Sequence, residues 1–264
     1  MLTIGFIGAG HMAQAMIKGW RDLAEVRQIV YAPNSGAAVA EQLQIEAVAS
    51  IEETFMQSDL LILAMPPKAL AEVAPTLQML LMLAPQKIIT SALGGVSISS
   101  LQAALGSQAQ VVRTLPNVNV AEKEGYTAIA FAGTLDAATR GAVFGLFTYF
   151  GRADELPEEQ FGAISALAGS GPAFVAAFVN ALSAAAVAQG IESEVADKVA
   201  LQMVNGTMKV LSKHEQTPTE FAHSVMTPGG STAAGWSTLE SEGFAKTVAK
   251  TIAATMQKNS EFDW

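Results

Sequence analysis

Two short glycine-containing turns carry the clearest signs of chemistry in this sequence. The first, Gly8-Ala9-Gly10-His11-Met12-Ala13, follows an apolar run and opens a helical pattern. Gly8 permits a tight turn, Gly10 lets the backbone approach a pyrophosphate, and Ala13 stands where a third glycine often lies. The phosphates would rest on the helix N-terminus, whose N–H groups lack partners. We therefore predict a dinucleotide site, the alternative being a packing turn. Its residues would be Gly8, Gly10, His11, Met12 and Ala13.

The end of the second predicted strand bears on the choice between NAD and NADP. An NAD site normally carries Asp or Glu there, which holds the ribose hydroxyls. Here the segment reads Tyr31-Ala32-Pro33-Asn34-Ser35, with no acid between Glu25 and Glu41. Without a carboxylate a 2′-phosphate is not repelled, and Asn34, the Ser35 hydroxyl and the next helix N–H groups would bind it. The segment has no arginine, so we predict NADPH and keep NADH as an alternative.

The second turn is Thr227-Pro228-Gly229-Gly230-Ser231-Thr232. Two glycines before a helix N-terminus form a nest of backbone N–H groups that suits an anion. No Lys or Arg occurs between Lys213 and Lys246. A carboxylate bound in this region must therefore use N–H groups and hydroxyls, whereas the alternative is an ordinary turn between helices. The predicted substrate-binding residues are Thr227, Gly229, Gly230, Ser231 and Thr232.

Two further segments have weaker signals. Residues 113–117, Arg-Thr-Leu-Pro-Asn, end a strand on the side where doubly wound sheets bind ligands. Asn117 would face the nicotinamide there, and a plain strand-end turn is an equal alternative. Residues 169–172, Gly-Ser-Gly-Pro, must interrupt their helix and permit close packing or close approach of a ligand.

Composition excludes several classes of protein. The chain has 264 residues, a formal net charge of -9 and no cysteine. Nucleic-acid binding needs a basic face, and thiolate chemistry and disulfides need cysteine. We therefore expect none of these three properties in this protein. The three histidines, His11, His214 and His223, are scattered, and we predict no metal site. Half of the residues are hydrophobic and only 15% are charged, which predicts surface that another subunit covers.

One segment needs a membrane test. Phe161–Ile191 contains no charged residue and is long enough to span a bilayer. It is rich in alanine, contains several polar residues and is interrupted at residues 169–172. A helix buried between subunits is the favoured interpretation, and a membrane span is the alternative. The N-terminus lacks a basic region before its apolar run, so we predict no signal peptide and a cytoplasmic location.

The first half of the chain alternates apolar runs with helical patterns. Strands are predicted at 2–7, 29–31, 60–64, 87–90 and 111–114, with edge strands at 127–131 and 152–155. Several runs are continuously apolar, as expected for strands covered by helices on both faces. This order predicts an α/β fold with a parallel, doubly wound sheet. Helices are predicted at 12–20, 69–83, 97–105 and 137–149.

Beyond Pro157 no strand is predicted. Thr217-Pro218-Thr219-Glu220 is a capping box with proline at the first helical position. It would begin a short helix, followed by one from about Ser231 and a last one over 245–258. The predicted domains are therefore 1–156, with the sheet, and 157–264, all helical.

The order of these motifs resembles pyrroline-5-carboxylate reductase over essentially the whole chain. The family pattern Gly-x-Gly-x-Met-Ala is matched at 8–13, and Arg-x-Met-Pro-Asn at 113–117, with leucine for methionine. Residues 168–174 resemble Ser-Gly-Ser-Gly-Pro-Ala-Tyr. The most specific pattern, Val-x-Ser-Pro-Gly-Gly-Thr-Thr-x-x-Gly, is matched at 225–235, with threonine for serine at 227 and serine for threonine at 231.

The resemblance implies an N-terminal Rossmann domain and a C-terminal helical dimerisation domain that interlocks with a second subunit. It also implies that the substrate, 1-pyrroline-5-carboxylate, places its carboxylate on the Gly-Gly-x-Thr segment. The resemblance adds the segment after the family's fourth strand to the cofactor site, here Ala64, Met65 and Pro66. There the family shows Ala-Val-Lys-Pro-Gln and this chain shows Ala-Met-Pro-Pro-Lys, so the family lysine's role is not carried over.

The implied reaction is hydride transfer from NAD(P)H to an imine carbon, the last step of proline biosynthesis. A protonated imine is already electrophilic, so the site needs orientation more than a strong acid. We assign Thr232 as the hydroxyl that hydrogen-bonds the ring nitrogen. A β-hydroxyacid dehydrogenase-like reductase would need a lysine on the long helix, which the uncharged stretch 161–191 lacks. A non-catalytic NADP-binding protein is the alternative of another class. The expected assembly is a homodimer or a larger assembly of dimers.

Overall fold

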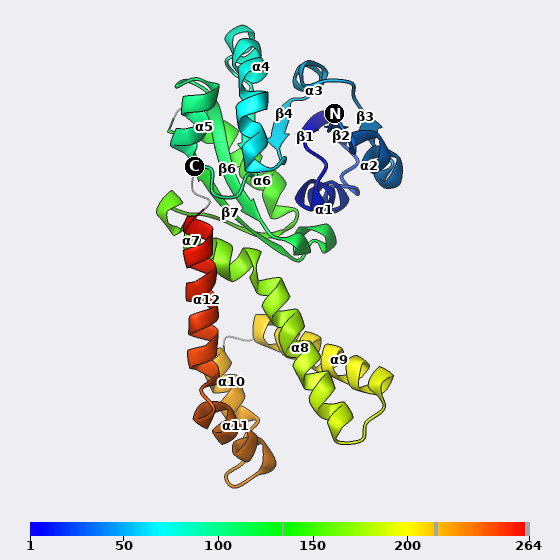
Figure 1. Ribbon diagram of the computed structural model, residues 1–264, viewed down its shortest axis with the longest axis vertical. Helices are drawn as coiled ribbons and strands as arrows, with labels where there is room; N and C mark the ends of the chain where they lie inside the picture. Colours follow the sequence, from blue (N-terminus) through cyan, green and yellow to red (C-terminus); the bar gives the residue numbers. More distant parts are fainter. Residues whose placement is uncertain (134, 214–215, 262–264) are drawn as a thin grey trace. The chain divides into compact units, whose positions relative to one another are not determined.

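Eight strands of the first half of the chain form one sheet, in the order β3-β2-β1-β4-β5-β6-β7-β8 (Figure 1). All neighbouring strands are parallel except β6 and β7, which are antiparallel. The doubly wound sheet with added strands at one edge is therefore confirmed. The strands are β1 Leu2–Ile7, β2 Val26–Tyr31, β3 Glu46–Ala47, β4 Leu60–Leu63, β5 Ile88–Ser91, β6 Gln110–Pro116, β7 Gly125–Phe131 and β8 Gly151–Glu155.

The structure is a computed structural model that describes residues 1–133, 135–213 and 216–261. It divides into two compact units. Unit 1 comprises Met1–Ser170 with Thr255–Trp264, and unit 2 comprises Gly171–Ala254. The long last helix, α12 (Phe244–Ser260), thus contributes to both units.

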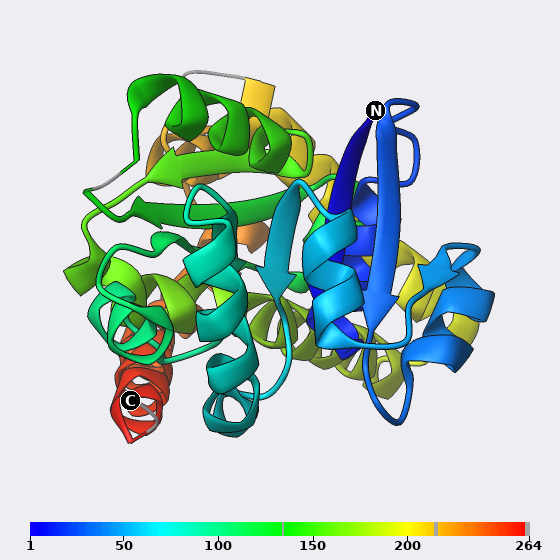
Figure 2. The same ribbon diagram turned by 90° about the horizontal axis from the view of Figure 1, so that it is seen from above.

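Helices cover both faces of the sheet (Figure 2). One face packs against α1 (His11–Gly19), α2 (Gly36–Leu43) and α6 (Ala137–Thr148). The other packs against α3 (Ile51–Gln57), α4 (Leu70–Leu83) and α5 (Ile98–Leu105). In β4, Leu60 and Ile62 face the first set of helices, and Leu61 and Leu63 face the second. Burial on both faces explains why the strand is apolar without alternation.

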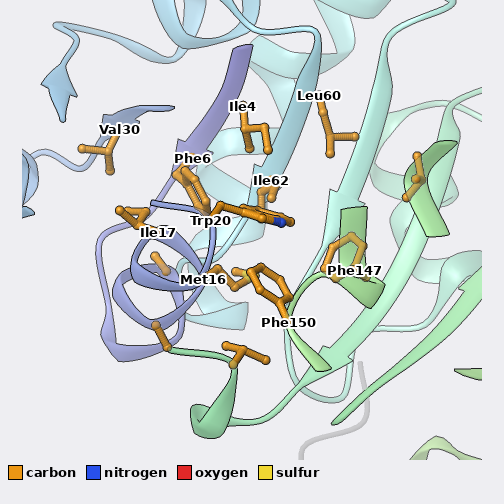
Figure 3. Close-up of a cluster of buried hydrophobic side chains, with 14 of the residues drawn as sticks. Ile4, Phe6, Met16, Ile17, Trp20, Val30, Leu60, Ile62, Phe147 and Phe150 are labelled. Atoms are coloured by element: carbon orange, nitrogen blue, oxygen red, sulfur yellow. The ribbon is translucent and has the colours of Figure 1, made fainter. Parts of the chain in front are cut away.

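An aromatic cluster fixes α1 and α6 on the first face (Figure 3). The ring of Trp20 lies 4.3 Å from that of Phe150 and 5.5 Å from that of Phe147, measured between centroids. Its indole N–H donates to the carbonyl oxygen of Leu146 at 2.9 Å, so the buried polar atom is satisfied. Since α1 begins at the predicted phosphate turn, this cluster holds that turn in place.

The chain after β8 enters a helix that is not regular. It runs from η3 (Glu158–Gln160) through α7 (Phe161–Ile164) and a π-helical turn, η4 (Ser165–Gly169), into α8 (Gly171–Ala188). The Ser170 N–H donates to the Ser165 carbonyl, five residues back. The predicted interruption at 169–172 is confirmed, and its form is a π-bulge.

Unit 2 contains α8, α9 (Ser193–Lys213), α10 (Pro218–Ser224), α11 (Ser231–Ser241) and part of α12. The Ser183 hydroxyl on α8 pairs with the Asp197 carboxylate on α9, and the two helices form a hairpin (Figure 1). The predicted capping box is present, with Thr217 and Glu220 bonding each other's backbone N–H groups. Within the described residues after 156, no strand occurs, as expected.

Apolar side chains of α8 and α9 are widely exposed within the single chain. Glu158–Ala188 is long and apolar enough to cross a membrane. Only 6% of its most apolar 18-residue segment is buried within the chain. The exposed apolar side chains include Val175 and Phe178 on α8, at 54% and 42% exposure, and Val199 on α9, at 59%. So much exposed apolar surface is unusual for a soluble monomer and indicates a face that something covers.

Two details of the organisation lie beyond the sequence patterns. Strand β3 has only two residues, both exposed, and was not predicted because such a short segment shows no periodicity. The division between the two compact units falls after Ser170, not at Pro157. The 156/157 domain boundary stays a prediction, since the helix that begins at residue 158 is shared between the units.

Candidate active site

The turn between β1 and α1 is built around Gly8. Its φ is +107°, a value that favours glycine, and its N–H donates to the Tyr31 carbonyl at 2.8 Å. A Cβ at this position would lie 2.5 Å from the Met65 nitrogen and 2.6 Å from the Ala64 carbonyl. The ends of β1, β2 and β4 therefore meet at a residue that has no side chain.

Gly10 has open space where Gly8 has none. It is the N-cap of α1, and a Cβ there would meet only the Ala64 oxygen, at 3.9 Å. His11 is exposed, Met12 is half-buried, and Ala13 is fully buried in the core. The first turn of α1 contains no acidic residue, so no carboxylate in that turn repels an anion at its N–H groups. This is a cradle into which a pyrophosphate fits.

A cavity of about 450 Å³ opens beside this cradle. Asn34 and Ser35 line it with the rest of the loop after β2, and Met65 and Pro66 line it from the end of β4. Ser35 is the N-cap of α2, and its hydroxyl makes no capping bond. Both Asn34 and Ser35 are exposed, so their polar groups are available to a ligand. Ala64 and residues 11–13 do not line the cavity; they shape it through the backbone.

A second cavity, of about 360 Å³, lies at the ends of β4, β5 and β6, and Pro66 lines both cavities. Its wall includes Lys68 on η1 (Pro67–Ala69), Gly94–Gly95 and Arg113. These ends are the carboxyl ends of parallel strands, where doubly wound sheets bind ligands. The two cavities on either side of Pro66 fit the two halves of a dinucleotide.

Arg113 is neutralised at the wall of the second cavity. Its guanidinium pairs with the Glu158 carboxylate at 2.6 Å and lies over the Phe161 ring, 4.7 Å from its centroid. The same Glu158 oxygen accepts the N–H of Ile98 at the start of α5, at 2.7 Å. The side chains of Arg113 and Glu158 are only 12% and 27% exposed. One carboxylate thus joins β6, α5 and the start of the long helix.

Asn117, the predicted nicotinamide contact, is held at the end of β6 by hydrogen bonds to the main chain. It is 7% exposed, its amide nitrogen donates to the Ala168 carbonyl at 3.0 Å, and its amide oxygen accepts from the Tyr126 N–H at 3.3 Å. It is not among the residues lining either cavity. These contacts favour the strand-end role that the sequence left open, because both ends of the amide already bind the main chain.

The second glycine turn lies in unit 2. The Gly230 N–H donates to the Thr227 carbonyl at 2.9 Å, and Gly229 has a φ of +73°. With proline second and glycine third, this is a type II turn, and Gly230 is the N-cap of α11. A Cβ on Gly230 would lie 2.3 Å from the Thr227 hydroxyl oxygen. Ser231 and Thr232 follow as the first helical residues, both exposed.

Among the described residues the Thr232 hydroxyl makes no hydrogen bond, so it is available to a ligand. Within the described part of the chain, no group of three or more His, Asp or Glu could hold a metal ion. His214 lies outside the described residues.

Two charged residues of the cavities were missed from the sequence. Lys68 lines the 360 Å³ cavity, and Glu72 is the one charged residue among those lining the 450 Å³ cavity. Both come from the segment between β4 and the first turn of α4. Their sequence signal is weak, since exposed charges near a helix start are common.

Comparison with known proteins gives a consistent result for both halves of the chain. Residues 158–262 match the family model for pyrroline-5-carboxylate reductase dimerisation, and residues 3–95 match that for NADP oxidoreductase, coenzyme F420-dependent. The pyrroline-5-carboxylate reductase of Aquifex aeolicus is 34% identical over 97% of this chain and 96% of its own length. The chain belongs to the pyrroline-5-carboxylate reductase family. The resemblance drawn from the motifs is confirmed.

Solved structures have the same fold over the whole length. The 1-pyrroline-5-carboxylate reductase of Streptococcus pyogenes is 30% identical, with a TM-score of 0.87 and 98% of each chain covered. The Plasmodium falciparum pyrroline carboxylate reductase with NADP bound has a TM-score of 0.88 over 100% of this chain and 98% of its own, at 24% identity. The α/β fold followed by a helical dimerisation domain is thus confirmed.

Family membership also decides between the alternatives. The protein is an NADP-linked oxidoreductase, and the β-hydroxyacid dehydrogenase alternative is set aside. The exposed apolar stretch that begins at Glu158 lies within the part matched by the dimerisation model. Its apolar surface therefore belongs to a dimerisation domain.

Proposed function

We propose that the protein reduces 1-pyrroline-5-carboxylate to L-proline with NADPH, with the nicotinamide end in the 360 Å³ cavity. The observation that carries this assignment is the shared wall at Pro66, which joins a cavity beside the phosphate turn to one at the ends of β4, β5 and β6. NADPH supplies the hydride, and the protein supplies position and an environment shielded from water.

The cofactor residues act mainly through the backbone. Gly8 and Gly10 bring the main chain and the α1 N-terminus to the pyrophosphate. Asn34 and Ser35 face the adenosine ribose and its 2′-phosphate from the loop after β2. Met65 and Pro66 separate the two halves of the site. NADPH is the preferred cofactor, with NADH as an alternative.

The substrate carboxylate binds the turn of unit 2. Gly229 and Gly230 direct backbone N–H groups at the start of α11 toward it, and the α11 dipole favours a negative charge. Thr227 and Ser231 add hydroxyls beside these groups. This arrangement explains how a carboxylate is held by a segment without Lys or Arg.

Thr232 hydrogen-bonds the ring nitrogen of the substrate. Its hydroxyl is exposed at the second position of α11 and is not used in capping the helix. The imine needs one proton on nitrogen, and a hydroxyl at this place either orients the ring or passes that proton. No strong acid is required, because a protonated imine is already electrophilic.

The assembly is a homodimer, or a larger assembly of dimers, formed through the helices of unit 2. Two copies of this chain cover the apolar side chains that one copy exposes, such as Val175, Phe178 and Val199. Residues 158–262 match the family model for dimerisation. This match supports a second copy of the chain, not a lipid bilayer, as the cover of these side chains. A net charge of -9 supports the absence of a nucleic-acid partner. The location is cytoplasmic.

The test is a reductase assay with a matched panel. Racemic pyrroline-5-carboxylate and a set of β-hydroxyacids are each incubated with the protein and NADPH or NADP, and the nicotinamide absorbance is followed. Oxidation of NADPH with the imine alone supports the proposal. Turnover of a β-hydroxyacid alone, or cofactor binding without turnover of any substrate, contradicts it. Light scattering at micromolar concentration tests the assembly, which a monomer would contradict.

A further inference from the structure

We infer that Glu72 is a specificity-determining residue for the cofactor, because its carboxylate opposes the 2′-phosphate of NADPH at the adenosine end of the site. This rests on the proposed function only in assigning the 450 Å³ cavity to that end of the cofactor. The loop after β2, which has no acid, favours NADPH over NADH. The Glu72 carboxylate makes this preference smaller than the loop alone would produce.

The charges around the cavity carry the inference. Its lining residues come from three places: the phosphate turn, the loop Tyr31–Ser35, and the segment from Met65 to Val73, with Ile51 from α3. Among these described residues Glu72 is the only one with a charge, and none is basic. A 2′-phosphate at this end therefore meets hydroxyl, amide and N–H groups together with one carboxylate.

The position of Glu72 follows from the packing of α4. Val73 and Ala74 are buried against the sheet, at 8% and 6% exposure, and this fixes the rotation of the helix. Glu72, in the first helical turn, is then exposed at the wall of the cavity. A carboxylate is stabilised in the first turn of a helix by the helix dipole. Glu72 is therefore favourable at this position.

Glu72 takes part in no ion pair among the described residues. Lys68, one turn earlier, lines the other cavity beyond Pro66 and is not a lining residue of this one. Pro66 itself stands where the family pattern has lysine, so a basic residue is also missing from the shared wall.

The expected size of the effect follows from the exposure of Glu72 to solvent. Salt screens an exposed charge over a Debye length of about 8–10 Å at physiological ionic strength. Two groups on the cavity wall interact through partly screened charges, and removal of one charge facing a dianion changes affinity by about tenfold. A ligand without the 2′-phosphate lacks most of this interaction.

The test measures binding of two ligands that differ only in the 2′-phosphate. Adenosine 2′,5′-bisphosphate and 5′-AMP are titrated by calorimetry into the wild type, Glu72→Gln and Glu41→Gln. Glu41 is an exposed acid on α2 that does not line the cavity, so its variant controls for net charge. Repeating the titrations at high salt shows whether the difference is electrostatic.

Glu72→Gln should bind the bisphosphate about tenfold more tightly and change 5′-AMP affinity less than about twofold, with a smaller gain at high salt. Glu41→Gln should change neither affinity. Asn34→Asp adds an acid on the loop after β2. It should weaken bisphosphate binding both in the wild type and in Glu72→Gln. An unchanged bisphosphate affinity in Glu72→Gln, or equal gains for both ligands, would overturn the inference. Neither ligand requires turnover, so these results are independent of whether the imine is reduced.

Discussion

The two glycine turns of this protein precede helices in the same way but are held by different forces. Gly8 has a φ of +107° and is enclosed by the backbone of Ala64 and Met65, more than fifty residues further along the chain. Gly229 has a φ of +73° and no atom within 4 Å of a Cβ built on it, the glycine's own neighbours aside. The helix after the first turn is anchored by buried side chains, whereas none of the described residues of α11 is buried.

The difference shows two ways to fix a glycine turn before a helix N-terminus. In unit 1 the sheet fixes the turn, so the geometry depends on where β1, β2 and β4 end. In unit 2 a type II turn fixes itself through the bond from the Gly230 N–H to the Thr227 carbonyl. Substitution of Gly8 should therefore disturb folding together with binding, and substitutions in the second turn should disturb binding alone.

The largest effect is expected from Gly8→Ala. The methyl group would lie 2.5 Å from the Met65 nitrogen at a φ that alanine rarely adopts. We expect a loss of about 2–3 kcal/mol in unfolding free energy. NADPH affinity should fall by about 100-fold, since a comparable binding energy is lost. Thermal unfolding and NADPH fluorescence titration measure the two effects.

Gly10→Ala is the matched control for that prediction. A Cβ on Gly10 meets only the Ala64 oxygen at 3.9 Å, so the unfolding midpoint should remain that of the wild type. NADPH affinity should still fall, because the methyl group blocks the approach of the pyrophosphate. Equal stability of both variants would show that the first turn is not held by the β4 backbone.

Thr232→Ala tests the second region through its hydroxyl. If that hydroxyl acts in the transition state, kcat should fall by about 100-fold with little change in KM. If it holds only the ground-state ring, KM should rise with little change in kcat. Thr232→Ser retains the hydroxyl and should remain near wild type. Unchanged kcat and KM in Thr232→Ala would remove Thr232 from the site.

Gly230→Val should raise KM for the imine by about tenfold or more, the equivalent of about 1.4 kcal/mol of carboxylate binding. Its Cβ would lie 2.3 Å from the Thr227 hydroxyl oxygen and distort the N–H groups of the turn. NADPH affinity and thermal stability should remain near wild type. The same Cβ would also lie 3.1 Å from the Thr227 carbonyl oxygen, so the distortion centres on the turn itself. A large loss of stability instead would contradict the local character of this turn.

The smallest effects are expected from removal of one ion pair in each unit, measured as the change in the free energy of unfolding. Glu158→Gln breaks the half-buried pair with Arg113 and weakens the contact with the Ile98 N–H. We expect a loss of about 1–2 kcal/mol, less than for a fully buried pair. Glu194→Gln breaks an exposed pair with Lys198 on α9 and should cost less than about 0.5 kcal/mol. Denaturant unfolding measures both, and similar losses would contradict the difference between the units.

Local features of the molecule were determined by the sequence itself. Continuous apolar runs predicted strands covered on both faces, and β4 is such a strand. The capping box at Thr217 and Glu220 and the break at 169–172 were predicted and are present. Each depends on residues within about one turn of one another, so propensity and spacing specify it.

Contacts between distant segments were decided only by the tertiary structure. The order of strands brings Ala64 and Met65 against Gly8, and the packing of α4 brings Glu72 to the cavity that Asn34 lines. The sequence after β2 gives no sign of Glu72, because this residue comes from another helix, α4. Asn117 likewise lies at a strand end, as predicted, but its amide binds the main chain of Tyr126 and Ala168. Sequence spacing specifies which residues reach the edge of a sheet, and only the packing of the elements decides which of them face one another.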